Sequence, residues 1–171
     1  DVYKRQCQEC ERWTLLTKNN FGHSTLSLND ELHKVDGMAT ITDFRDGERP
    51  EVTIDLTPAF GGNLTSVRRR FVKESPASLL VEDQLELNEQ TRVVVWQLMT
   101  TADVVPSEEG AVLRKDGREL RLDVLAPEGV GVSVISLDPP PLELDRRIGN
   151  LKRVEIRVPA WYLAGHGGRI E

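Results

Sequence analysis

The residue best suited to chemistry in this chain is His23, which follows a segment rich in Asn and Gly. Residues 19–28 read Asn-Asn-Phe-Gly-His-Ser-Thr-Leu-Ser-Leu. Their alternation predicts a strand with His23 and Ser27 on a polar face and with Leu26 and Leu28 on the opposite, apolar face. An imidazole on such a face can ligate a metal or act as an acid or base. The alternative is an ordinary surface or hydrogen-bonded histidine.

Two further histidines are weaker candidates. His33 lies ten residues after His23, beyond an Asn29-Asp30 turn. Pairing across that hairpin would bring both imidazoles onto neighbouring strands, where His33 could support a ligand, and otherwise it is a surface histidine. His166 lies in a Gly-His-Gly-Gly loop and is expected to face solvent.

One dense basic run, Arg68–Arg70, is predicted to be part of a strand. Two of its arginines would then lie on one face and Arg69 on the other. The functional interpretation is contact with sulfates or carboxylates of a ligand. The alternative, which we favour, is cross-strand pairing with an acidic strand that contains Glu82, Gln84 and Glu86.

Alternation with a period of two recurs along the chain and predicts strands. It is clearest in residues 25–29, 51–57, 79–87, 120–124 and 153–158.

Three other segments also favour strands. Residues 77–89 lack Gly and Pro and could form a helix, but their charges fall at alternate positions, which favours a strand. Residues 13–17 have a strand-like composition. Val93–Trp96 is apolar on both faces, which predicts a central strand with Val94 and Trp96 buried.

Short turns with Gly, Asn or Asp separate these segments, most clearly at Asp116-Gly117. About a dozen strands without crossover helices predict an all-β fold, a two-layer, mainly antiparallel β-sandwich with under about a tenth of its residues in helix. Arg121, Glu155 and Arg157 occupy polar positions of their strands and are expected to be exposed.

The composition is that of a soluble globular domain. The 171 residues (19.2 kDa) are 39% apolar and 29% charged, with a formal charge of −6. This balance gives no bulk attraction to nucleic acid or to an acidic membrane, so neither is an expected partner. The sequence has no stretch of 18 apolar residues that would span a bilayer.

Both ends of the chain are interpreted as cut. A back-translation of Asp1–Gln6 resembles the transposon end used in sequencing libraries, so we interpret these residues as translated adapter. Residues 7–171 are assigned to a single domain, truncated at both ends. Cys7 and Cys10 form a Cys-x-x-Cys pair, which is half of a zinc site or a redox pair. Because no second ligand pair follows, incidental thiols are the favoured interpretation.

From about Glu11 to its end, the chain resembles the β-domain of the heparinase II/III family of polysaccharide lyases. The matching motifs, in order, are Glu11-Arg12-Trp13, Asn19-Asn20-x-x-His23-Ser24-Thr25-Leu26, the Asn29-Asp30 turn, His33-Lys34-Val35, Asp55-Leu56-Thr57-Pro58, Val67-Arg68-Arg69-Arg70 and Val81-Glu82-Asp83-Gln84. The family usually has His-Asn-Thr-Leu, and Ser24 replaces the Asn here. The strand pattern directs Ser24 toward the hydrophobic layer, away from the polar-face chemistry.

The resemblance implies a larger enzyme that cleaves acidic, uronic-acid-containing polysaccharides, such as glycosaminoglycans, by β-elimination. The family's catalytic Asn, His and Tyr lie on an N-terminal (α/α) toroid, and none of them maps onto this sequence. Its β-domain holds a zinc through a His and an Asp from upstream strands and through the His of the His-x-Thr-Leu motif, which is His23 here. This chain would therefore supply one zinc ligand and one wall of the cleft, and would be inactive without the missing toroid. The family also implies a periplasmic or secreted location.

The rival interpretation is a non-catalytic carbohydrate-binding or structural β-sandwich module. Such modules present exposed aromatic side chains to sugars. Aromatic residues make up only 5% of this chain, and Trp13, Trp96 and Trp161 are far apart in the sequence, which disfavours that function.

Overall fold

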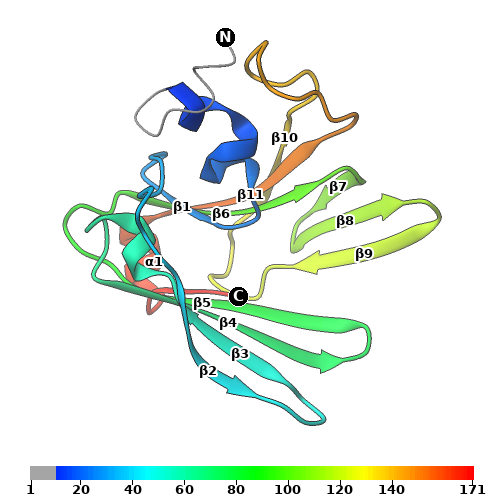
Figure 1. Cartoon of the computed structure of the whole chain (residues 1–171). Coiled ribbons are helices and arrows are strands. Elements are labelled where there is room, and N and C mark those ends of the chain that lie inside the picture. Colours follow the sequence, from blue (N-terminus) through cyan, green and yellow to red (C-terminus); the bar gives the residue numbers. More distant parts are fainter. Residues whose placement is uncertain (1–10) are drawn as a thin grey trace. The chain divides into compact units, whose positions relative to one another are not determined.

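The computed structural model describes residues 11–171, which form mainly antiparallel β-strands (Figure 1). Strands account for 46% of the residues and helices for 12%. The predicted all-β, sandwich-like class is confirmed, with three sheets where two were expected and slightly more helix than expected. The interpretations of Asp1–Gln6, Cys7 and Cys10 concern residues outside the described part of the chain.

The strands are short and follow one another closely. They are β1 (Leu26–Leu28), β2 (Thr40–Arg45), β3 (Glu51–Asp55), β4 (Ser66–Ser75), β5 (Ser78–Glu86), β6 (Val93–Thr100), β7 (Asp103–Ser107), β8 (Gly110–Lys115), β9 (Arg118–Asp123), β10 (Val132–Ser136), β11 (Lys152–Pro159) and β12 (Arg169–Ile170). The helical segments are the 3-10 turns η2 (Glu11–Thr14), η3 (Leu16–Lys18), η4 (Asn20–Gly22) and η5 (Thr57–Phe60), and the short helix α1 (Ala160–Gly165).

These strands form sheets of four, five and three members. The strand orders are β1-β6-β11-β10, β12-β5-β4-β3-β2 and β7-β8-β9. The predicted strand over 77–89 is confirmed as β5, which pairs with β4 along almost its whole length. The predicted hairpin is also confirmed: Lys115 pairs with Arg118, and Asp116 and Gly117 both have positive φ, as a two-residue hairpin turn requires.

The chain divides into two compact units, each assembled from three stretches of sequence. The first contains the stretch ending at Ser27 together with residues 95–123 and 131–157. Its core has two buried clusters, one of Leu16, Leu137 and Leu151, and one of Ala102, Ala111 and Leu113. Leu98 and Val132 pack against the second cluster, so β6 and β10 contribute to the same core as the β7–β8 hairpin.

The second unit contains residues 28–94, 124–130 and 158–171 and holds the five-stranded sheet. Val67, Leu85 and Ile170 are almost fully buried on three strands of that sheet. Leu163 of α1 is also fully buried, and the backbone N–H of Leu85 donates to the Gly168 carbonyl that follows α1. The C-terminal segment is therefore part of this unit's core.

The strand predicted over residues 13–17 is wrong, because η2 and η3 occupy this region. The N–H of Leu15 donates to the Arg12 carbonyl and that of Lys18 to the Leu15 carbonyl, so these turns satisfy their own backbone groups. The Asp145 carboxylate accepts from the Leu16 N–H at 2.7 Å, a contact made across 129 residues. Because Asp145 is so far from Leu16 along the chain, the sequence around Leu16 carries no pattern that would predict this contact.

The burial predictions are correct in part. Val94 is fully buried, and Arg121 and Arg157 are exposed, as expected. Trp96 is only partly buried. Glu155 is 3% exposed, so the expectation that it faces solvent is wrong. β11 is an interior strand of its sheet, and packing covers its polar positions as well as its apolar ones.

Candidate functional site

His23 lies at the end of η4, three residues before β1, and its side chain is exposed. The prediction that a strand runs through His23 is therefore wrong, because β1 begins only at Leu26. The backbone of His23 is nevertheless extended, with φ −127° and ψ 153°, and its N–H donates to the Asn20 carbonyl at 3.2 Å. The imidazole thus projects from a link between a 3-10 turn and a buried strand.

The side chain of Gln97, on β6, binds the backbone of this link. Its Nε2 donates to the His23 carbonyl at 2.8 Å and also to the Asn20 carbonyl. Gln97 is 1% exposed, so the donor of both hydrogen bonds is shielded from water. The backbone that carries the His23 imidazole is therefore held in place while the ring stays accessible.

The neighbouring serines differ from their predicted orientations. Ser24 was expected to face the hydrophobic layer, but it is exposed, and its Oγ accepts the Met99 N–H at 2.9 Å. Ser27 was expected on the polar face with His23, but it is 1% exposed and its Oγ accepts from Asn20 Nδ2 at 3.3 Å. Alternation failed here because residues 23–25 are not part of the strand.

The two asparagines before His23 have structural roles. The Asn19 side chain accepts the Phe21 N–H at 3.0 Å and donates to the Trp13 carbonyl at 3.1 Å, so it caps η4 and ties it to η2. Asn20 is buried and bonds Ser27. The segment rich in Asn and Gly therefore builds the support for His23.

An ionic cluster on β11, centred on the buried Glu155, holds the same segment. Arg153 Nε lies 2.7 Å from a carboxylate oxygen of Glu155, and Arg157 lies 3.6 Å from the other oxygen. Arg153 also donates to the Phe21 carbonyl at 3.0 Å and lies 5.8 Å from the Phe21 ring centre. The buried Glu155 and Gln97 were missed as support residues, although a polar residue directly after the apolar run 93–96 was a usable signal.

His33 does not join His23 on a hairpin. Residues 31–39 form no strand, and the His33 ring packs edge-on against Phe60 of η5 at 4.7 Å between ring centres. The proposed support role of His33 is therefore wrong, because the Asn29-Asp30 turn leads into a loop. His166 is exposed at the end of α1, as expected, and its ring stacks on Tyr162 at 4.2 Å.

The Arg68–Arg70 run lies on β4 with the predicted two-faced pattern. Arg70 lies 3.2 Å from Glu82 and 3.4 Å from Glu51, which confirms the predicted cross-strand pairing. Arg69 is buried on the other face, where it binds Asp83 through two hydrogen bonds of 2.8 and 2.7 Å. The run is therefore largely neutralised by the chain's own carboxylates.

The described residues could supply one ligand to a zinc site but not a complete set of ligands. Within residues 11–171, no three His, Cys, Asp or Glu side chains are grouped so that they could hold a metal ion. His23 can offer an exposed imidazole nitrogen, and further ligands would have to come from outside this part of the chain.

None of the helices in the described part of the chain has the length and apolar character needed to cross a membrane. No protein-family model and no curated protein matches this sequence.

Proposed function

We propose that this chain is the β-domain of a heparinase II/III-like polysaccharide lyase and that His23 is its contribution to a zinc site. The observation that carries the proposal is the exposed imidazole of His23 on a backbone that the buried Gln97 holds. A ligand for a metal completed by other segments has to be accessible on its own domain and fixed in direction.

The support around His23 suits that role. Asn20, Ser27 and Gln97 are buried and bonded to one another or to the backbone around His23, and Arg153 binds the adjacent Phe21 carbonyl. These groups hold the backbone that carries the imidazole and leave its ring nitrogens for a metal. The base and acid of the β-elimination are expected on the toroid, so the chain alone would be inactive.

The test uses the full-length gene product with its upstream sequence. We expect His23→Ala to lose zinc, measured by elemental analysis, and to lose lyase activity on a uronide polysaccharide. His166→Ala is the matched control, because His166 is also exposed but lies far away in the sequence, directly after α1. Full zinc occupancy in His23→Ala would refute the ligand role, and absence of lyase activity in the parent protein would refute the enzyme class.

A second candidate function is a sugar-binding module, which one observation favours. Trp161 is 76% exposed, and it is held edge-on against Tyr162 with 5.6 Å between ring centres. An exposed, oriented indole can stack on a sugar ring. Glycan binding by this chain that Trp161→Ala abolishes and His23→Ala spares would favour the module over the lyase domain.

A further inference from the structure

The outer strand β2 offers an open edge. In the described part of the chain, its one neighbouring strand is β3. The two strands pair from Thr40, opposite Asp55, to Arg45, opposite Glu51. Five of its six residues are exposed, including Ile41 at 63% and Phe44 at 67%. The free edge of such a strand can pair with a further strand.

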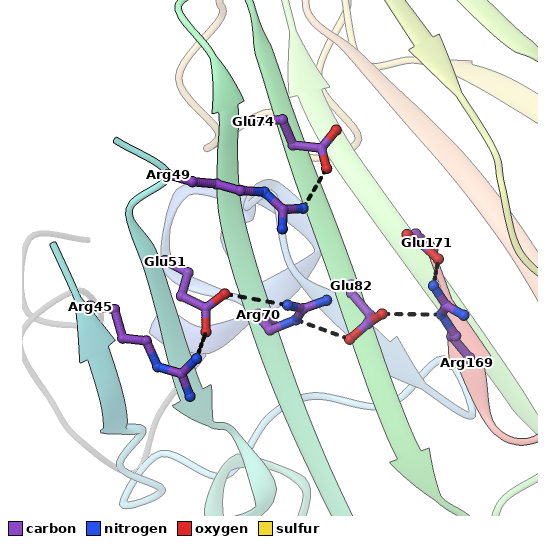
Figure 2. A network of polar contacts seen from close by, with 8 residues as sticks. All are labelled: Arg45, Arg49, Glu51, Arg70, Glu74, Glu82, Arg169 and Glu171. Atoms are coloured by element: carbon purple, nitrogen blue, oxygen red, sulfur yellow. Dashed lines mark hydrogen bonds and ion pairs between the residues drawn. The ribbon is translucent and has the colours of Figure 1, made fainter. Parts of the chain in front are cut away.

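One face of this sheet carries a row of alternating charges that ends on β2. Figure 2 shows the row running from Arg169 of β12 through Glu82, Arg70 and Glu51 to Arg45. Going from Glu82 to Arg45, the three ion pairs of the row measure 3.2, 3.4 and 3.3 Å.

Arg45, at the end of this row, stays exposed although it pairs with Glu51 and Asp43 of its own chain. It is 69% exposed and lies 3.1 Å from Asp43, which is itself 45% exposed. An acidic group on a further strand would extend the alternation by one step.

The opposite face carries an apolar row that ends at the same place. The register aligns Phe44 with Val52, Val52 with Phe71, and Phe71 with Val81. The three inner residues are partly buried, whereas Phe44 is exposed because no strand in the described part of the chain lies beyond it. Both rows therefore end at adjacent residues of one strand.

We propose that β2 pairs antiparallel with β2 of a second copy of this chain, around a two-fold axis at Phe44. In this register Asp43 lies opposite the second copy's Arg45, and Arg45 lies opposite the second copy's Asp43. Both charge pairs are then complementary on one face, and the two Phe44 rings meet on the other. A second copy is the favoured occupant because this short sequence is complementary to itself.

The β2 edge limits the strength of this contact. A β-bulge between Ile41 and Asp43 interrupts the regular strand, and the turn at Asp46 ends it on the other side. The overlap is therefore short and centred on Asp43–Arg45, so we expect a weak, reversible contact.

Sedimentation velocity over a concentration series tests the pairing. In Arg45→Asp, the carboxylate at position 45 of each copy lies opposite the Asp43 carboxylate of the other copy. In Asp43→Arg, the guanidinium group at position 43 of each copy lies opposite that of Arg45 in the other copy. Each variant alone should therefore associate at least about tenfold more weakly than the parent chain. Arg114→Asp, an exposed charge reversal on β8, is the matched control and should associate like the parent.

An equimolar mixture of Arg45→Asp and Asp43→Arg gives the decisive result. Both charge pairs are complementary in the mixed dimer, so association should return to about the parent level. A monomeric parent chain, self-association of either variant at the parent level, or a mixture that stays monomeric would each overturn the proposal. Amide hydrogen exchange of the parent is a second measurement: residues 40–45 should gain protection as concentration rises, and no gain would also overturn it.

Discussion

At the scale of the residue, the most demanding group is the buried pair Arg69–Asp83. Burial raises the pKa of the Asp83 carboxyl, and the two hydrogen bonds from Arg69 oppose that rise. Asp83 is fully buried and the Arg69 side chain is 8% exposed, so water can replace neither partner. The pair therefore acts as one unit, and removing one member should be worse than removing both.

Asp83→Ala should lower the free energy of unfolding by about 3–5 kcal/mol, because it leaves the Arg69 guanidinium buried without its carboxylate. Urea denaturation measures this loss. The control is Glu119→Ala, which breaks the exposed Arg114–Glu119 pair and should cost under about 1 kcal/mol. A double variant, Arg69→Met with Asp83→Leu, should recover much of the loss, and equal losses for Asp83→Ala and Glu119→Ala would contradict this account.

At the scale of the element, close contacts between strand backbones decide where glycine is required. Gly110 begins β8 and Gly117 lies in the turn that ends it, and both have positive φ. A Cβ at Gly110 would overlap the Leu122 carbonyl of the neighbouring strand, whereas a Cβ at Gly117 meets open space. Comparing Gly→Ala at the two positions therefore distinguishes the cost of backbone strain from the cost of steric overlap.

Gly117→Ala should cost about 1–2 kcal/mol through its left-handed backbone alone. Gly110→Ala should cost more, about 3 kcal/mol or above, because the β8–β9 ladder has to shift as well. Thermal and urea unfolding of the two variants compare these costs. Equal destabilisation would show that the overlap with Leu122 is relieved without cost.

The loop between β10 and β11 depends on one carboxylate. Asp138 accepts from the Asn150 N–H and from Arg147 Nε, each at 2.9 Å. The Asn150 N–H and then Arg147 lower the pKa of Asp138. Since the folded pKa lies below the unfolded one, the stabilising contribution is complete above the unfolded pKa and is lost as the pH falls through the folded pKa.

Asp138→Asn should therefore destabilise the chain at about pH 7, and its difference from the parent should shrink as the pH falls below about 4. Urea midpoints of both proteins at about pH 7 and about pH 3 measure this change. A difference that stays constant or grows on acidification would show that the Asp138 charge does not contribute.

At the scale of the whole molecule, the described residues offer one exposed donor at the candidate metal site and no group of three. A functional zinc site usually needs three protein ligands. This chain by itself should therefore bind zinc weakly or not at all.

Titration with zinc against a chromophoric chelator should show less than one tightly bound ion per chain. A Cys7→Ser/Cys10→Ser variant separates any contribution of the thiols, which lie outside the described residues. Stoichiometric binding that survives in this variant and disappears in His23→Ala would mean that the chain completes a site of its own.

The sequence by itself determined the features that depend on residues close to one another along the chain. Alternation with a period of two located β5 and β9, and Asp-Gly chemistry located the turn at residues 116–117, because side-chain direction and turn conformation are local properties. Alternation also placed Arg69 on the opposite strand face from Arg68 and Arg70. The acidic strand that pairs with Arg70 was evident from its composition.

Only the tertiary structure decided which polar positions are covered. Glu155 lies on an interior strand and Ser27 lies on β1 beside β6, so both are buried although the local pattern predicted exposure. The turns around Leu16 likewise depend on Asp145, which is 129 residues away. Burial and long-range hydrogen bonds depend on what packs against a segment, which the segment's own residues do not encode.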